Sequence, residues 1–134
     1  MSVKKIAHIQ KCLTRLKEHQ NIESEKFLLD LDAQDIVLHN IQLAIQGCID
    51  ISNHIIADRG WGVPSVQSEA FNIMASQKVT SPGTADIMRK MTGFRNLIIH
   101  EYQQTDFLKV HEILNTRLND IQEYLRQTIK FCDL

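Results

Sequence analysis

The chain has 134 residues, an ordinary length for one folded unit, so we expect residues 1–134 to form a single domain with its own hydrophobic core. Its 5 Gly and 2 Pro are too few for the many turns of a β-sandwich, and the composition therefore favours helices. The formal net charge of −1 argues against a broad basic surface that coats nucleic acid. DNA is therefore not an expected partner, although a local phosphate site stays open.

The first half of the chain predicts two helices. Apolar residues recur at helical spacing over residues 3–19, and a less regular segment at 21–32 follows, with a turn and a short helical piece. The second helix, over about 33–58, has two apolar stripes, which predicts burial on two sides. One side would face the core of the domain, and the other could face a second subunit.

Two breaks divide the second half. Paired glycines and a proline within 59–64 cannot continue a helix, and Ser65 is expected to cap a third helix over 66–76. Another break at 80–83 precedes the next helix. These breaks are short, so neighbouring helices are expected to run up and down beside one another.

The fourth helix starts near Thr84, and Gly93 weakens it locally but could allow another backbone to approach closely. Thr105 with Asp106 starts one last helix, whose apolar stripe continues to Ile129. No segment long enough for a β-strand alternates apolar and polar residues with a period of two. The sequence therefore predicts an all-α, up-and-down bundle of about five helices.

The cysteines and the N-terminus indicate a soluble, cytoplasmic protein. Cys12, Cys48 and Cys132 lie far apart and match no zinc spacing, so free thiols in a reducing compartment are expected. The basic N-terminus leads into amphipathic sequence, and no apolar run is long enough to span a bilayer. We therefore expect no metal, no cofactor and no membrane contact.

The residues best suited to chemistry lie near the end of the fourth helix, where the segment from Arg95 to Tyr102 reads RNLIIHEY. The signatures of P-loop hydrolases, α/β hydrolases and zinc peptidases are absent from the sequence. A guanidinium can hold a phosphate, and an imidazole exchanges protons near neutral pH. Arg and His together are enough for RNA cleavage without a metal. From spacing alone, such a set more often consists of cationic side chains that stabilise a helix C-terminus.

Helix geometry constrains how this motif can work. On a straight helix Arg95 and Tyr102 share a face, whereas His100 lies about 140° round from Arg95. Either the helix frays around 99–102, or two copies of the motif share a cleft across a two-fold axis. The two-sided second helix makes a homodimer attractive.

The motif resembles the signature of HepT-like proteins of the HEPN superfamily, which is Arg, four residues, His, any residue and Tyr. Arg95, His100 and Tyr102 match it without a gap, and Asn96 fills the polar position after the Arg. The resemblance covers about residues 35–130. It includes segments 46–51, 62–65 and 69–71.

The resemblance implies a homodimeric, HEPN-like bundle that acts as a metal-independent endoribonuclease toxin of a type VII toxin–antitoxin system. Its substrate would be mRNA or tRNA. Arg95 would bind the scissile phosphate, His100 would move protons, and Asn96 and Asp50 would support the site. The implied partner is a minimal nucleotidyltransferase antitoxin, MntA-like, that neutralises the toxin by transferring AMP to Tyr102.

A second hypothesis belongs to another class, a non-catalytic module that binds substrate for a nucleotidyltransferase or regulates it. The complete pair of Arg95 and His100 favours the ribonuclease, and the near-neutral charge mildly favours the binding module. Cleavage of RNA by the purified chain distinguishes the two.

Overall fold

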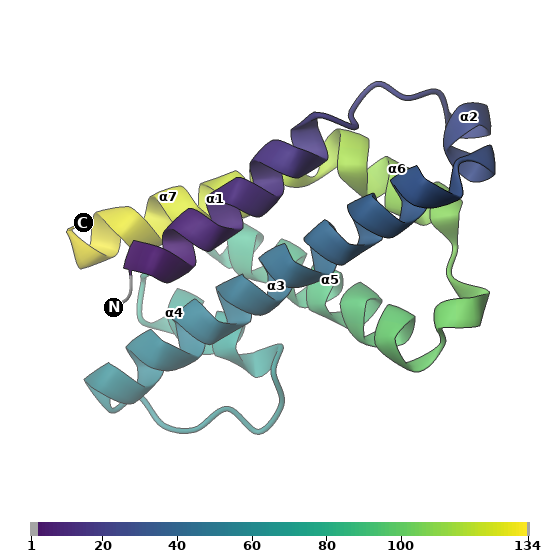
Figure 1. Cartoon of the computed structure of the whole chain (residues 1–134). Coiled ribbons are helices and arrows are strands. Elements are labelled where there is room, and N and C mark those ends of the chain that lie inside the picture. The colour runs from purple at the N-terminus through teal and green to yellow at the C-terminus, as the bar shows by residue number, and fades with distance from the viewer. Residues whose placement is uncertain (1–2, 134) are drawn as a thin grey trace.

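A computed structural model describes residues 3–133, with the side chain of Tyr102 outside the description. Within this range the chain forms seven α-helices and one 3-10 helix and no strand, so the predicted all-α class is confirmed. In chain order they are α1 (Val3–Lys17), α2 (Ser24–Leu29), α3 (Leu31–Arg59), α4 (Glu69–Ser76), α5 (Pro82–His100), η1 (Tyr102–Gln104), α6 (Phe107–Thr116) and α7 (Leu118–Cys132) (Figure 1).

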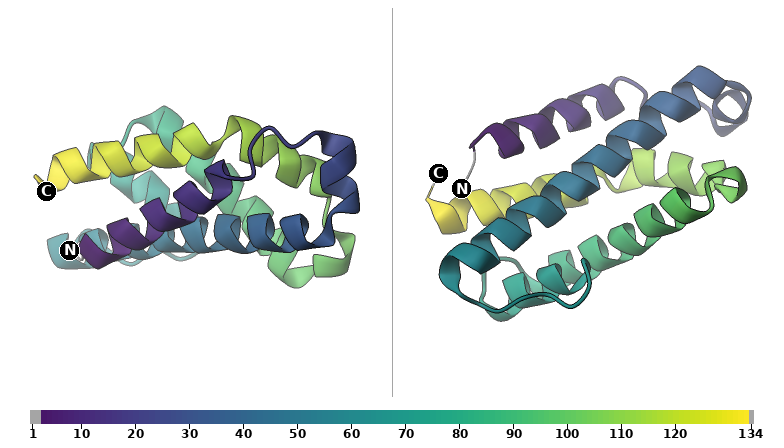
Figure 2. Two further views of the ribbon diagram at one scale, coloured as in Figure 1. Left: turned by 45° about the horizontal axis from the view of Figure 1, so that its top comes forward. Right: turned by 60° about the horizontal axis from the view of Figure 1, so that its bottom comes forward.

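The long helix α3 is the centre of the bundle. Helix α1 packs along one side of it, and α4 and α5 lie on the other side (Figure 2). Both apolar stripes of α3 are buried by the chain itself, as Ile41 and Ile45 illustrate with no exposed surface. The suggestion that the second stripe faces another subunit is therefore wrong, because helices of the same chain cover it.

A glycine sets the distance between α1 and α3. A Cβ atom placed at Gly47 of α3 would lie 2.6 Å from Cγ1 of Ile9, which is closer than side chains tolerate. Gly93 was expected to permit such an approach, but a Cβ atom built there has no described neighbour within 4 Å. Within one chain the close helix crossing therefore depends on Gly47.

The predicted break after the second helix is confirmed, but the start of α4 differs. Gly60 ends α3 with a φ of +65°, a conformation that glycine adopts readily. Ser65 does not cap α4. Its N–H and Oγ donate instead to the Glu69 carboxylate at 2.6 and 2.5 Å, and this lowers the pKa of Glu69. The loop is therefore tied to the first turn of α4, which starts at Glu69.

Helix α5 starts slightly earlier than predicted, because its first residues have strong start signals. Ser81 Oγ accepts a hydrogen bond from the Thr84 N–H at 3.1 Å, and Pro82 occupies the first turn. These signals place the helix start within the break predicted at 80–83.

The single last helix of the prediction is divided in two at Arg117. Asn115 Nδ2 donates to the carbonyl of His111 at 2.9 Å, and Thr116 Oγ1 donates to the carbonyl of Glu112 at 2.6 Å. Side chains that bond back to a carbonyl four residues earlier bend helices. Two of them in succession lie at the point where α6 ends at Thr116, and this division gives the bundle one more helix than the prediction had here.

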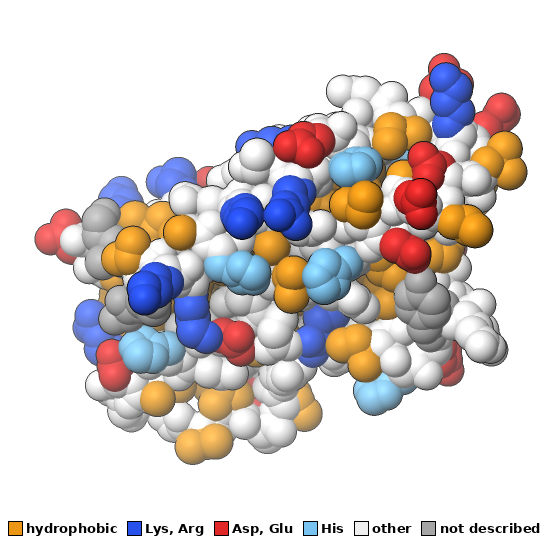
Figure 3. All heavy atoms as spheres, in the orientation of Figure 1, with side chains coloured by type: hydrophobic (Ala, Val, Ile, Leu, Met, Phe, Trp, Pro, Cys, Tyr) orange, Lys and Arg blue, Asp and Glu red, His pale blue; other side chains and the backbone are white. Residues whose placement is uncertain are grey.

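Two further expectations from the sequence concern the cysteines and the length of apolar segments. All three cysteines are free, and burial raises the pKa of both Cys12 and Cys48. No helix in the described part of the chain is long and apolar enough to cross a membrane. The face seen in Figure 3 mixes basic and acidic side chains and has no continuous basic surface.

Candidate active site

The predicted motif lies at the C-terminal end of α5. This helix is continuous from Pro82 to His100, and the Glu101 N–H closes its last turn by donating to the Leu97 carbonyl at 2.8 Å. The 3-10 helix η1 then begins at Tyr102. The helix therefore does not break between Arg95 and His100, and the predicted fraying does not bring them to one face.

Arg95 points into the bundle and is only 6% exposed. Its guanidinium donates to Oε1 of Gln46 on α3 and to Oε1 of Gln67 in the loop before α4. It also donates to Oδ1 of Asn96 at 2.7 Å. All three acceptors are neutral amide oxygens, so they fix the guanidinium in place without neutralising its charge.

Asp50 is connected to Arg95 through the side chain of Gln46. Gln46 Nε2 donates to Asp50 Oδ1 at 2.8 Å, and Lys5 Nζ lies 3.5 Å from Asp50 Oδ2. Burial lowers the pKa of Arg95, and the charge of Asp50 opposes this shift. Because an arginine starts from a very high pKa, Arg95 stays a cation. The structure thus connects the two predicted residues through Gln46.

His100 lies on a different face of the same helix. Its side chain is exposed and forms no hydrogen bond or ion pair with the described part of the chain. Tyr102 was predicted to share a face with Arg95, but its side chain lies outside the described residues. A single chain therefore brings together Arg95, Asn96 and Asp50, whereas no described hydrogen bond or ion pair joins His100 to them.

Sequence reasoning missed the two glutamines that hold Arg95. Gln46 had a local signal, because it lies four residues before Asp50 on one helix face, where an amide and a carboxylate can bond. Gln67 had none, because it belongs to a separate loop 28 residues before Arg95. Such a partner becomes visible only when the helices are packed.

The helical bundle with this motif defines a protein of the HEPN class. A family model described as Ribonuclease HepT-like matches residues 9–128, and the chain belongs to this family. It is 29% identical over 123 residues to an mRNA nuclease HepT of Shewanella oneidensis, covering 92% of each chain. It is also 29% identical to a tRNA nuclease HepT of Aphanizomenon flos-aquae, covering 89% of this chain and 81% of that protein.

Solved structures extend this similarity to a complex. The chain resembles a tri-AMPylated HEPN toxin of Shewanella oneidensis in complex with an MNT antitoxin, with 29% identity and a TM-score of 0.87 over 96% of each chain. It also resembles a chain of a toxin–antitoxin crystal structure with AMP-PNP. That match has 28% identity and a TM-score of 0.86, and it covers 94% of this chain and 95% of the other.

Proposed function

We propose that the protein is an endoribonuclease toxin that cuts mRNA or tRNA without a metal ion and is neutralised by a minimal nucleotidyltransferase antitoxin. One observation carries this proposal. The buried Arg95 guanidinium is fixed by neutral acceptors and keeps its charge, while an imidazole lies near the end of the same helix. The names of the two relatives, an mRNA nuclease and a tRNA nuclease, support the substrate class.

The reaction uses the ribose next to the cleaved bond. The 2′-oxygen attacks phosphorus, the bond from phosphorus to the 5′-oxygen breaks, and a 2′,3′-cyclic phosphate is left on one product. His100 takes the proton of the 2′-hydroxyl or returns one to the leaving 5′-oxygen, as imidazoles do near neutral pH. Arg95 donates to the phosphate oxygens, whose negative charge grows in the transition state.

The residues around Arg95 act as positioning residues. Asn96 and Gln67 accept hydrogen bonds from the same nitrogen, Nη2, and Gln46 accepts from Nη1. Asp50 orients the Gln46 amide, so that its oxygen and not its nitrogen faces Arg95. A phosphate that replaces the exposed Gln67 as acceptor would find the guanidinium already in place.

We further propose that the working site forms in a homodimer. Arg95 points inward and His100 is exposed on one continuous helix, where the two positions lie about 140° apart round the axis, so one chain does not turn them toward each other. Apolar side chains next to His100 are exposed, with Leu97 at 57% and Ile99 at 53%. Pairing the ends of two α5 helices across a two-fold axis would cover them and bring His100 of one subunit to the site of the other.

The regulatory part of the proposal concerns Tyr102. It starts η1, two residues after His100, and therefore lies beside the proposed site along the backbone. AMP on the Tyr102 hydroxyl would add bulk and negative charge where substrate phosphate must bind. The tri-AMPylated toxin that the chain resembles supports AMP as the modifying group.

The nuclease is tested with chain purified without a nucleotidyltransferase and incubated with tRNA and mRNA in the presence of EDTA. We expect wild type to cut RNA and to leave 2′,3′-cyclic phosphate ends, and His100→Ala and Arg95→Ala to be slower by about a hundredfold or more. His54→Ala, which changes an exposed histidine of α3, is the matched control. Intact RNA with wild type would favour the non-catalytic module.

The modification is tested by co-expression with the nucleotidyltransferase and intact-mass measurement. We expect a mass increase in multiples of one AMP group that disappears in Tyr102→Phe. The chain has 2 tyrosines, and Tyr124→Phe is the matched control because Tyr124 is buried and its hydroxyl is 2.5 Å from Ser52 Oγ. An increase that persists in Tyr102→Phe rejects the assignment.

A further inference from the structure

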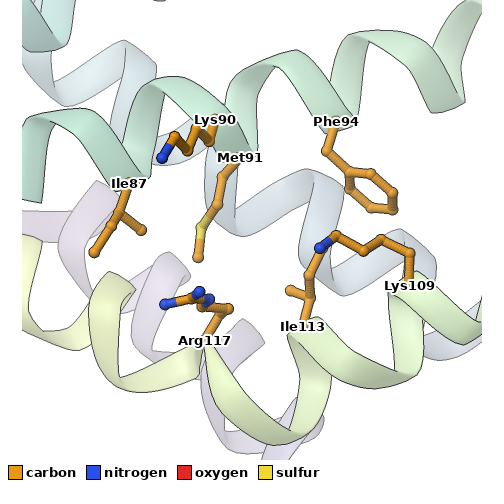
Figure 4. A pocket seen from close by; sticks show the side chains of 7 residues that line it. All are labelled: Ile87, Lys90, Met91, Phe94, Lys109, Ile113 and Arg117. Carbon is orange, nitrogen blue, oxygen red and sulfur yellow. The ribbon is translucent and has the colours of Figure 1, made fainter.

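A small cleft lies between α5 and the junction of α6 and α7. The residues that line it take no part in the proposed reaction. Its volume is about 140 Å³, and Met91, Phe94 and Ile113 contribute to its apolar wall. Figure 4 shows Met91 and Phe94 of α5 pointing toward α6 and toward Arg117, which lies between α6 and α7. Among the described residues that line the cleft, three are cations and none is acidic. They are Lys90, Lys109 and Arg117.

These cations are available to a ligand. Each has one acidic partner about one turn away along its own part of the chain, and the pairs measure 3.1, 3.1 and 3.5 Å. They are Lys90 with Asp86, Lys109 with Glu112, and Arg117 with Asp120. Local pairs between exposed side chains contribute little to stability, so a bound anion can replace the carboxylates at small cost.

The size and the wall of the cleft favour one aromatic ring. An apolar cavity of about 150 Å³ holds a benzene molecule, so a cavity of about 140 Å³ suits a single six-membered ring. Phe94 offers an aromatic surface on which a base can stack, and stacking of this kind holds single-stranded RNA in many proteins. The cations at the rim suit the phosphates on either side of that base.

We propose that this cleft binds one pyrimidine nucleotide of the RNA substrate, with the base against Phe94 and its phosphates on Lys109 and Arg117. This inference rests on the proposed ribonuclease function and adds a subsite to it. Phe94 lies six residues before His100 on α5, or about 9 Å along the helix axis. On a straight helix Phe94 also lies about 120° round the axis from His100, so the cleft would hold a nucleotide further along the strand than the cleaved bond and would set a preference for the RNA sequence near the cut.

The test measures binding of labelled oligouridylate and oligoadenylate to the full chain in a non-cleaving His100→Ala background, by fluorescence anisotropy at several salt concentrations. Replacing Lys109 and Arg117 together with Gln is expected to weaken oligouridylate binding about tenfold or more. The slope of log affinity against log salt should fall by about 1.4, because each lost contact to single strands contributes about 0.7.

The aromatic surface is tested separately with Phe94→Leu, which keeps an apolar side chain of similar size. We expect oligouridylate to bind at least about fivefold more weakly, with an unchanged salt slope and a smaller effect on oligoadenylate. The matched control replaces Arg126 and Lys130 of α7 with Gln, because Arg126 also pairs with an acid of its own helix, Glu123. Thermal unfolding verifies that each variant is folded.

The outcomes separate the cleft from the reaction. If wild type cuts RNA and the cleft variants bind like the Arg126 and Lys130 control, the subsite is rejected and the proposed function stands. If wild type leaves RNA intact but oligouridylate binding depends on Phe94 and Lys109, the proposed function fails and the cleft stands only as a site that binds RNA. Unchanged RNA binding with a changed sedimentation coefficient would make the cleft a protein interface and overturn the proposal.

Discussion

Arg95 and His100, the two proposed catalytic residues of α5, differ in burial. Arg95 is enclosed by the bundle and is held by amides from α3, from the loop before α4 and from its own neighbour. His100, five residues later, is exposed and is the last residue of the helix. The chain thus prepares the phosphate-binding half of the proposed site by itself. The proton-transfer half, His100, has no described partner in the chain. This is expected if a second molecule completes the site around it.

The strongest test of this difference mixes two inactive variants. If Arg95 of one subunit works with His100 of the other, a heterodimer of Arg95→Ala and His100→Ala contains one complete site and one without either residue. Co-expression at equal levels should make about half of the dimers mixed, so activity should return to about a quarter of wild type. Initial rates of RNA cleavage measure this recovery. A mixture as inactive as its two components would place the site within one chain.

The next largest effect concerns stability and should separate the two ends of the motif. Arg95→Met keeps the apolar stem but removes the donors for Gln46, Gln67 and Asn96, so we expect a loss of about 1–3 kcal/mol in the free energy of unfolding. His100→Ala removes an exposed side chain and should change it by less than about 0.5 kcal/mol. Urea denaturation measures both values. Equal losses would mean that the buried hydrogen bonds of Arg95 do not stabilise the fold.

Much of the fold could be predicted because its signals are local. Gly60 marks the end of α3, and Ser81 with Pro82 marks the start of α5. The angle between Arg95 and His100 also follows from the helix repeat alone, since α5 is unbroken. Each of these inferences needs only neighbours within about one or two turns.

The missed features depend on contacts that no local pattern contains. The broad apolar surface of α3 suggested a partner subunit, but periodicity cannot tell a helix of the same chain from one of another chain. Gln67 reaches Arg95 from a loop, and Gly47 meets Ile9 across a helix crossing. The division at Arg117 had a local cause in Thr116, but Thr in a helix often leaves the helix intact.

The helix crossing at Gly47 provides a prediction for the enclosed side of the molecule. Gly47→Ala places a Cβ atom 2.6 Å from Ile9 Cγ1, so α1 and α3 must separate or Ile9 must leave its rotamer. We expect a loss of about 1–3 kcal/mol in the free energy of unfolding, measured by urea denaturation. Adding Ile9→Ala should make the loss smaller than the sum of the two single variants. Additive losses would mean that this contact is not the cause.

A small effect of the opposite sign is expected at Gly93, on the outer face of α5. A Cβ atom there meets no described atom within 4 Å, so Gly93→Ala should raise the stability of the monomer by about 0.5–1 kcal/mol through helix propensity. If the outer face of α5 joins two subunits, the same methyl group should weaken the dimer in analytical ultracentrifugation. A more stable monomer with an unchanged dimer would move the subunit contact away from Gly93. A less stable monomer would show that this glycine has a role within the chain.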